Sequence, residues 1–345
     1  MSEPGGTVLV TGASGFIAGH CILQLIEAGH AVRGTVRDLA RSDRVRETLA
    51  RQGADPQRIS FVAADLSSDA GWSEAVSGVD QVLHVASPLP GAMPRDPDEL
   101  IRPARDGTLR VLRAAKAAGV PRVVVTSSTA AICYGRGDPG RPFTEADWSD
   151  PDGADNSAYT RSKTLAERAA WHWLETEGEG LELVTVNPGL VLGPVLEQDY
   201  GTSAEAVLKL LNGDFPGTPR LGFPIVDVRD VAALHLLAMT HPAAAGQRFL
   251  ATNGFCWMEE IATILRDAFP AYARRMPARR LPGWLVRLVS LFDPVTRGVL
   301  FELDVRRECD ASKAQTMLGW SPRSPADAIR ATGESLIAVG AVKPL

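Results

Sequence analysis

The sequence predicts an α/β protein built on a Rossmann-like, doubly wound parallel sheet, with a smaller and mostly C-terminal substrate-binding region. From residue 7 to about 187, short apolar runs alternate with segments of helical periodicity, and this alternation indicates parallel strands joined by helices. The first apolar run leads through a glycine-rich turn, VTGASGFIAG, into a helical pattern. The length of 345 residues allows one large α/β domain or two smaller ones.

The expected strands of the first half are short runs rich in Val, Ile and Leu, as is typical of strands buried on both faces. In order they are residues 7–11, 31–36, 59–64, 80–87, 121–128 and 181–188. Helices are expected to begin near Phe16 and to cover 97–118 and 156–177. Short, right-handed connections between such elements favour the doubly wound arrangement.

The character of the chain changes after Pro188. Residues 189–225 are rich in Gly and Pro and predict loops and short helices that shape a pocket. Helical periodicity returns at 230–240, 257–268 and 325–338. We therefore expect a dinucleotide-binding domain over 1–188, completed by about 226–250, and a substrate-binding region over 189–225 and 251–345. A run of arginines predicts a solvated face, with a partner surface as the alternative: Arg274, Arg275, Arg279, Arg280 and Arg287.

Composition and charge argue against several classes of function. The net charge of −5 gives no basic excess with which to neutralise a nucleic-acid backbone, so nucleic acid is not an expected partner. No signal segment is present and no stretch approaches the roughly 20 apolar residues of a membrane span, which predicts a cytoplasmic protein without membrane association. The four cysteines and six histidines lack metal-ligand spacing, so we expect no metal, free thiols and structural histidines.

The turn after the first strand is suited to a phosphate. Gly12 and Gly15 leave the backbone bare where a helix begins, and free N–H groups meet the positive end of the helix dipole there. Gly19, one turn further on, would let the helix pack closely on a strand. An ordinary strand-to-helix turn is the alternative, because glycine patterns of this kind also occur without a nucleotide.

A tyrosine and a lysine stand four residues apart in YTRSK, so Tyr159 and Lys163 would share one face of a helix. An ammonium beside a phenol favours the phenolate, which would lower the pKa of Tyr159 and allow acid–base work. The alternative is an exposed pair without a catalytic role. Ser128 follows an apolar strand, at the edge where open α/β sheets bind ligands. It could bond a substrate oxygen, or simply cap a helix or turn.

Five stretches in this order resemble the extended short-chain dehydrogenase/reductase family over nearly the whole chain. They are TGASGFIAG at 11–19, TSS at 126–128, YTRSK at 159–163, NPGLVLGP at 187–194 and VDVRDVA at 226–232. Within that family, HVASP, PARDGTLRVL, TSS and the arginine of VRD are most similar to one branch. It contains dihydroflavonol reductases, cinnamoyl-CoA reductases and microbial aldehyde or ketone reductases.

The resemblance implies a catalytic set in which Tyr159 protonates a carbonyl oxygen and Ser128 holds that oxygen. Lys163 would hold the nicotinamide ribose and lower the pKa of Tyr159. Asp227 and Asp230 are expected to be structural, because Asp at a loop-to-helix junction can cap the helix. The implied cofactor residues are Gly12, Ser14, Gly15, Phe16 and Ile17 at the turn, Asp65 and Leu66 at the adenine, Val85, Ala86 and Ser87 along the channel, Thr126, Tyr159 and Lys163, and Pro188 and Val191 at the carboxamide.

The choice between NAD and NADP follows from charge. About 20 positions beyond the glycines, Rossmann proteins place an acidic residue for the 2′-hydroxyl of NAD or an arginine for the 2′-phosphate of NADP. That position falls on Val36, and Arg37 follows it. Arg37 can pair with a phosphate through several donors, which favours NADPH. Asp38 is expected to be a turn or cap residue, but a shift of register would make it an NAD ligand.

The substrate is expected to be a small carbonyl compound. Reductases of flavonoids in the resembling branch tend to carry a polar residue five places after the catalytic serine, and Cys133 stands there, which argues against a polyhydroxylated flavonoid. Apolar candidates for the pocket wall favour an aromatic or aliphatic aldehyde or ketone, although each also fits ordinary packing. They are Leu89, Pro90, Leu192, Val195, Tyr200 and Phe223.

Three functions remain at this point. The first is NADPH-dependent reduction of an aldehyde or ketone, or the reverse oxidation. The second is a sugar-nucleotide epimerase or dehydratase of the same family that retains NAD, against which Arg37 argues. The third is a non-catalytic redox sensor that binds a dinucleotide, against which the complete set of Ser128, Tyr159 and Lys163 argues. The sequence leaves a monomer and a homodimer open.

Overall fold

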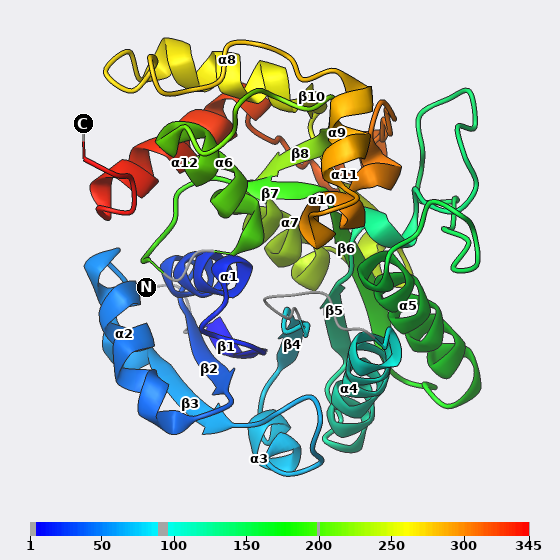
Figure 1. Ribbon diagram of the computed structural model, residues 1–345. Helices are drawn as coiled ribbons and strands as arrows, with labels where there is room; N and C mark the ends of the chain where they lie inside the picture. The colour runs from blue at the N-terminus through cyan, green and yellow to red at the C-terminus, as the bar shows by residue number, and fades with distance from the viewer. Residues whose placement is uncertain (1–4, 89–95, 199–200, 345) are drawn as a thin grey trace.

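The computed structural model describes residues 5–88, 96–198 and 201–344, and a seven-stranded parallel sheet lies at its centre (Figure 1). The strand order is β3-β2-β1-β4-β5-β6-β9, so the chain winds outward in both directions from β1. The bounds are β1 Gly5–Val10, β2 His30–Val36, β3 Ile59–Ala63, β4 Gln81–His84, β5 Arg122–Thr126, β6 Glu182–Pro188 and β9 Arg248–Ala251. The expected fold class and the six expected strands are confirmed.

Helices cover both faces of this sheet (Figure 1). On one face, α1 (Phe16–Glu27) packs against α7 (Val228–Thr240), and α2 (Ser42–Arg51) lies at the β3 side. On the other face, α4 (Asp98–Ala117) packs against both α5 (Ala158–Thr176) and α3 (Trp72–Val76). The helices expected at 97–118, 156–177 and 230–240 are confirmed to within two residues at each end.

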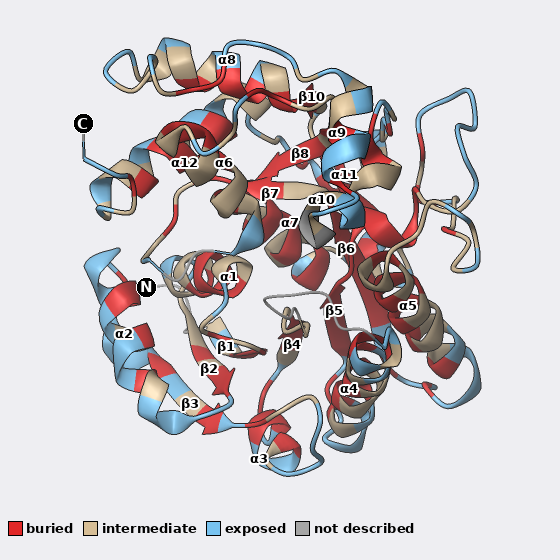
Figure 2. Cartoon of the chain, viewed as in Figure 1, coloured by how far each residue is buried: buried red, intermediate tan, exposed pale blue. Residues whose placement is uncertain are grey.

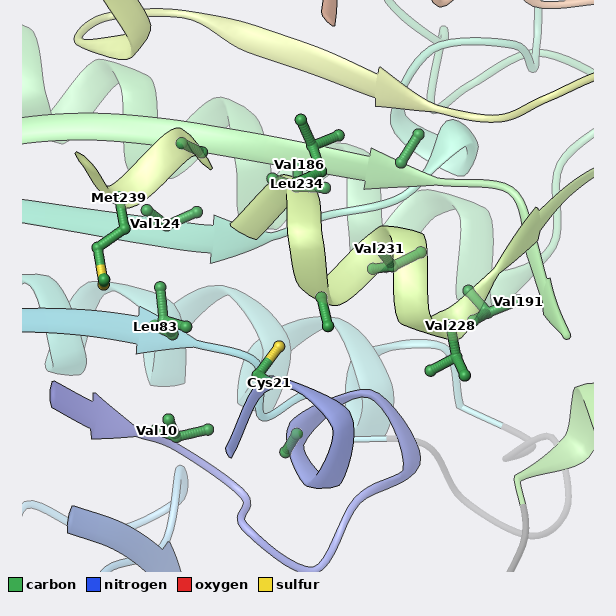
Figure 3. Packing of buried hydrophobic residues seen from close by; sticks show 14 of the residues in the cluster. Val10, Cys21, Leu83, Val124, Val186, Val191, Val228, Val231, Leu234 and Met239 are labelled. Atoms are coloured by element: carbon green, nitrogen blue, oxygen red, sulfur yellow. The ribbon is translucent and has the colours of Figure 1, made fainter. Parts of the chain in front are cut away.

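Apolar side chains of the sheet and helices form one continuous core on the α1/α7 face. Figure 3 shows Val10 and Leu83 from the strands lying opposite Cys21 of α1 and Val231 of α7. The buried residues of the helices face the sheet, whereas their outer faces are exposed (Figure 2). The helical periodicity of the apolar residues therefore determines which face of each helix packs against the sheet.

A second, three-stranded sheet lies beside the first, in the order β10-β8-β7. Its strands are β7 Leu190–Leu192, β8 Gly222–Asp227 and β10 Phe255–Trp257, with β7 parallel and β10 antiparallel to β8. The helices α6 (Thr202–Asn212), α8 (Met258–Ala268) and α12 (Pro325–Ala338) pack around it. The expectation of only loops and short helices over 189–225 was therefore wrong at β7 and β8.

β7 and β8 were not predicted because the local sequence pattern of a strand is weak in both. β7 has three residues, and Pro224 lies inside β8, the central strand of this sheet, where proline is normally disfavoured. The two strands pair through a close approach of their backbones. A Cβ on Gly189 would lie only 2.2 Å from the carbonyl oxygen of Pro224. Only glycine at 189 permits that approach of the two backbones.

The remaining elements are short. They are α9 Gly283–Val289, α10 Pro294–Gly298 and α11 Ser312–Leu318, with 3-10 turns η1 Leu39–Arg41, η2 Pro56–Arg58, η3 Thr129–Ala131, η4 Pro242–Ala244 and η5 Leu300–Glu302. Arg274, Arg279, Arg280 and Arg287 are exposed, as expected of a solvated face. Arg275 instead donates to the backbone oxygens of Lys343 and Pro344. Within 5–88, 96–198 and 201–344, no helix is long and apolar enough to span a bilayer.

We expect the core to respond to truncation at Phe249 of β9, which is fully buried. Phe249→Ala should lower the free energy of unfolding by about 3–5 kcal/mol, because a large ring is replaced by a cavity. Phe292→Ala, the same change at a side chain that is 83% exposed, is the matched control and should alter it by less than about 0.5 kcal/mol. Urea denaturation checks both, and similar losses in the two variants would contradict the packing described here.

Candidate active site

The carboxyl ends of the parallel strands meet at one edge of the large sheet, and the residues singled out in the sequence lie along it. The β1–α1 turn, Arg37 after β2, Asp65 after β3 and Ser128 after β5 all occupy this edge. Ligands of open α/β sheets bind at such an edge where the winding direction changes, which is between β1 and β4 here.

Glycine is required at position 12 of the β1–α1 turn because the backbone φ is positive there and Ala86 lies close. Gly12 has φ of +67°, and a Cβ there would lie 3.0 Å from the Cβ of Ala86. The N–H of Gly12 donates to Thr35 Oγ1 at 3.0 Å, and that of Gly15 to the carbonyl oxygen of Gly12 at 2.8 Å. Gly15 is the N-cap of α1 and supplies no side chain to cap the helix. Ser14, Phe16 and Ile17 are half-buried at the same helix start.

Thr11 and His84 fasten this turn to β4. The hydroxyl of Thr11 lies 2.9 Å from His84 Nδ1 and accepts from the N–H of Ala86 at 2.9 Å. The stretch Val85, Ala86 and Ser87 is thereby held directly beside Gly12. Burial, followed by the positive charge of Lys163, lowers the pKa of His84 to about 3, so its imidazole is neutral at physiological pH.

Gly19 does not have the role expected for it. A Cβ at Gly19 would lie 2.8 Å from Leu196 Cδ1, in the loop that follows β7, and not against a strand of the large sheet. The reason is that this side of α1 faces the 194–197 segment, where His20 Nε2 also lies 2.9 Å from the oxygen of Pro194. A cavity of about 30 Å³ separates Ser14 and Gly15 from Leu196 and Glu197.

Arg37, Asp38 and Asp65 lie at the ends of β2 and β3. The Asp38 carboxylate accepts from the N–H of Ala40 at 2.9 Å as the N-cap of η1, so the expected cap role is confirmed. Arg37 is exposed. Hydrogen bonds from Ser67 are the main cause of the lowered pKa of Asp65, and the charge of Arg37 adds to it. Arg37 therefore exerts its charge on the edge where Asp65 lies.

The α5 helix presents Tyr159 and Lys163 on one face. Ser157 and Thr160 form a capping box that begins the helix immediately before Tyr159. Lys163 Nζ lies 5.9 Å from the centroid of the Tyr159 ring. Burial lowers the pKa of Lys163 to about 8, while the carboxylate of Glu167 acts in the opposite direction.

The pKa of Tyr159 is raised, which corrects the lowering expected from Lys163. Burial of the phenol is the largest cause, because it disfavours the phenolate, and a hydrogen bond with Ser128 acts in the opposite direction. The phenol is thus a protonated donor at neutral pH. The opposing effect of Ser128 indicates that its hydroxyl lies close to the phenol.

Ser128 lies two residues after β5 and caps the short η3 turn. Its hydroxyl accepts from the N–H of Ala130 at 3.1 Å and donates to the carbonyl oxygen of Pro188 at 3.5 Å. Asn187 Nδ2 donates to the Ser128 carbonyl oxygen at 3.2 Å. Ser128 therefore has the cap role that the sequence left open.

A buried carboxylate, Glu167, lies one helical turn beyond Lys163 and organises the surroundings of Ser128. Its side chain is fully buried, and five donors converge on it from α5, β6, β9 and the residue that follows β5. They are Ser127 Oγ, Trp171 Nε1 (3.3 Å), Thr185 Oγ1 (3.1 Å), Asn187 Nδ2 (2.7 Å) and Arg248 Nε (2.7 Å).

The side chains of several residues expected in the site pack into the core instead. Thr126 Oγ1 lies 2.7 Å from His235 Nε2 of α7, and Val191 packs with Val228 in the cluster of Figure 3. Leu66 packs toward α4, where a Cβ on Gly107 would lie 2.7 Å from the Leu66 Cβ.

The expected substrate-pocket residues that the structure describes are buried or half-buried. Leu192, Val195 and Cys133 are buried, and Phe223 is half-buried beside the second core cluster. These positions fit the packing alternative left open by the sequence. Leu89, Pro90 and Tyr200 lie outside the described residues.

Asp227 and Asp230 have the structural roles expected of them. Asp227 is the N-cap of α7 and also pairs with Arg229, their side chains being 2.7 Å apart. Asp230 accepts from the backbone N–H of Arg323 at 2.6 Å and pairs with its guanidinium. A hollow of about 870 Å³ is found elsewhere, between α3 and α4, and none of the expected site residues lines it.

Comparison with known proteins places this arrangement in a family. Residues 8–250 match the NAD dependent epimerase/dehydratase family. The chain belongs to that family, the extended short-chain dehydrogenases/reductases. The branch suggested by the sequence is confirmed, so the protein is an oxidoreductase of the reductase branch of this extended family.

Individual relatives agree with that placement. A cinnamoyl-CoA reductase of Medicago truncatula is 37% identical over 279 residues, covering 78% of this chain and 83% of the relative. Dihydroflavonol 4-reductase of Zea mays is 35% identical over 287 residues, covering 81% and 78%. The crystal structure of the yeast methylglyoxal/isovaleraldehyde reductase Gre2 complexed with NADPH has a TM-score of 0.80 at 27% identity, covering 97% of this chain and all of that one.

Some residues of the site were not predicted from the sequence, chiefly Glu167, His84 and Arg248. One usable signal existed for Glu167, since it lies four residues after Lys163 and so on the same helical face. His84 was correctly expected to be structurally satisfied, but its bond to Thr11 depends on strand pairing. Arg248 lies 81 residues from Glu167, a separation that no local pattern bridges.

The low pKa of His84 predicts that stability falls in mild acid. Between the unfolded pKa of about 6.5 and the folded pKa of about 3, only the unfolded chain binds the proton. Stability linked to His84 is therefore full above the unfolded value and declines by roughly 1.4 kcal/mol per pH unit below it. His84→Gln should flatten this slope, measured by urea denaturation at several pH values. The exposed His172→Gln control should keep it, and an unchanged slope in His84→Gln would contradict the assignment.

Proposed function

We propose that this protein reduces an aldehyde or ketone to the alcohol with NADPH, or performs the reverse oxidation. The observation that carries the proposal is the meeting of Ser128, Tyr159 and Lys163 at the carboxyl edge of the sheet, beside a glycine turn that bears no capping side chain. This arrangement supplies a hydrogen-bond donor, a proton donor and a buried cation within one site.

The residues at the β1–α1 turn fit a dinucleotide. Gly12 and Gly15 expose the start of α1 without a side chain, as close approach of a pyrophosphate requires. In this proposal the cofactor also meets Asp65, the 85–87 segment and Pro188, while Lys163 holds the nicotinamide ribose. A bound nicotinamide supplies the hydride for the reduction.

The chain's own residues handle the proton. Tyr159, protonated because burial raises its pKa, donates its proton to the carbonyl oxygen of the substrate. Ser128 donates a hydrogen bond to the same oxygen, which stabilises the charge that develops there. Lys163, with a pKa of about 8, is largely cationic at neutral pH and stabilises the phenolate that remains.

The preference for NADPH rests on Arg37. It is exposed at the end of β2, whereas the carboxylate of Asp38 is engaged by the N–H of Ala40. Arginine in this position can pair with a 2′-phosphate through several donors. Yeast Gre2, which shares the fold over nearly its whole length, is complexed with NADPH.

The substrate proposed is an aromatic or aliphatic carbonyl compound, bound by a region comprising 189–225 and 251–345. The relatives' names include cinnamoyl-CoA, dihydroflavonol and methylglyoxal/isovaleraldehyde reductases, all of which describe carbonyl substrates. Cys133 in place of a polar side chain speaks against a polyhydroxylated ligand, because its thiol is a weak hydrogen-bonding group. A panel of carbonyl compounds assayed for NADPH oxidation tests the proposal.

We expect Tyr159→Phe to lower turnover on that panel by about 100-fold or more, because the proton donor is lost. The dissociation constant for NADPH, followed by nicotinamide fluorescence, should change little. Tyr272→Phe, at a half-buried tyrosine of the C-terminal part, is the matched control and should retain activity. Turnover of Tyr159→Phe within about tenfold of the parent would reject this catalytic assignment.

Arg37→Ala should shift cofactor preference toward NADH. Each charge-assisted hydrogen bond lost with the 2′-phosphate is worth roughly 1.5–3 kcal/mol, and NADH lacks that phosphate. Asp38→Ala is the opposing variant, and it should leave both affinities nearly unchanged. Dissociation constants are compared at one fixed salt concentration because phosphate contacts are screened. A selective loss of NADH affinity in Asp38→Ala would reverse the choice of cofactor.

A further inference from the structure

Two cysteines that are 176 positions apart in the chain lie in contact beside the catalytic loop. Cys133 Sγ and Cys309 Sγ are 3.4 Å apart. Cys133 comes five residues after Ser128 and is buried, whereas Cys309 is half-buried and lies on the C-terminal segment. The other two cysteines, Cys21 and Cys256, are buried in different places, in α1 and β10.

We propose that Cys133 and Cys309 are a redox modification site, in which a peroxide converts the two thiols into a disulfide that restrains the Ser128 loop and lowers turnover. The formation of the disulfide is independent of the proposed function. Only its effect on turnover depends on that function.

The backbone on both sides holds the two sulfur atoms together. The N–H of Cys133 donates to the carbonyl oxygen of Thr129 at 2.9 Å, and its own carbonyl oxygen accepts from Arg307 Nε at 3.1 Å. Cys309 lies between two bonds to Phe143, which donates to Glu308 and accepts from Asp310, both at 2.8 Å. A disulfide has an S–S distance of about 2.05 Å, so the sulfur atoms need to approach by roughly 1.4 Å.

Exposure sets the order of the chemistry. Burial raises the pKa of Cys133 well above its usual value, so that thiol is a poor first nucleophile. The half-buried Cys309 is the one that a peroxide reaches. Its thiolate attacks the peroxide O–O bond, forming a sulfenic acid and releasing water or an alcohol, according to the peroxide.

The second step closes the disulfide. Cys133 Sγ attacks the sulfenic sulfur of Cys309, the S–O bond breaks, and the hydroxide leaves with the Cys133 proton as water. Overall, two thiols and one peroxide give one disulfide and two molecules of water, or one of water and one of alcohol. The two sulfur atoms are oxidised and the peroxide oxygens are reduced. Dithiol reductants reverse the reaction, as expected for a regulatory disulfide in a reducing compartment.

The cross-link would act on catalysis through the loop that carries Ser128. Cys133 follows η3, whose N-cap is Ser128, and the N–H of Cys133 is bonded to Thr129. Drawing Cys133 toward Cys309 therefore pulls on the short segment that sets the Ser128 hydroxyl. A displacement of about 1 Å at a positioned catalytic group can cost about 100-fold in rate.

The test treats the full-length reduced protein with hydrogen peroxide and measures its intact mass, free thiols and cross-linked peptides. We expect a mass lower by two hydrogen atoms, a 133–309 cross-link, and a fall in turnover of about 10- to 100-fold that dithiothreitol restores. Cys309→Ser and Cys133→Ala should abolish the cross-link, and two variants are used in case the buried substitution impairs folding. Cys256→Ser is the matched control and should still form it.

Distinct results would overturn the proposal. Oxidation of Cys309 to sulfinic or sulfonic acid without a cross-link would exclude the disulfide. A cross-link that leaves turnover unchanged would exclude its action on the Ser128 loop. If the reduced protein reduced no carbonyl compound, the proposed function would fail, but mass and peptide mapping would still decide whether Cys133 and Cys309 pair.

Discussion

The buried carboxylate of Glu167 is the interaction on which the geometry of the site depends. Removing an ionised carboxylate from water costs several kcal/mol, and that cost is offset only where charged and polar partners replace the water. Here Arg248 supplies the opposite charge. Thr185 and Asn187 of β6 supply donors, as does Ser127 immediately after β5. The helix that carries Tyr159 is thereby fixed to the segment that follows β5 and carries Ser128. Asn187 extends the same network to the Ser128 carbonyl oxygen.

The interactions around Glu167 also determine which side chains of the site carry a net charge. Arg248 neutralises Glu167 directly at 2.7 Å, and burial together with Lys163 keeps His84 neutral. Lys163 therefore remains the positive group nearest to the Tyr159 ring among these residues. Burial raises the pKa of the Tyr159 phenol because it disfavours the phenolate. The effect of Ser128 opposes that of burial and favours the phenolate.

The sequence was sufficient for the large sheet because its strands carry a local signal. Parallel strands covered on both faces are apolar throughout, so the runs around Val8, Val124 and Val184 are visible without any alignment. The small sheet was not predicted, since β7 is very short and Pro224 interrupts β8. Its pairing depends on Gly189, whose importance appears only when the two backbones are brought together. Local propensity is overridden there by tertiary contact.

The same distinction applies to the site. Tyr159 and Lys163 could be paired from their spacing, and Ser128 could be placed from its position at a strand end, because helical and strand geometry fix both. The direction of the Tyr159 pKa could not be predicted, since burial outweighs the neighbouring charge and burial is a tertiary property. The contact between Cys133 and Cys309 was invisible for the same reason.

The C-terminal segment supports the site as well as extending the fold beyond the Rossmann sheet. Arg307 donates to the carbonyl oxygen of Cys133 at 3.1 Å and to Asp155 Oδ2 at 2.8 Å, and it pairs with Glu302. Glu302 in turn accepts from the hydroxyl of Tyr134 at 2.7 Å. One buried guanidinium thus joins the two ends of the loop that runs from Ser128 to Tyr159. Since that loop sets the distance between the two hydroxyls, changes in the C-terminal segment can alter the site without contacting substrate or cofactor.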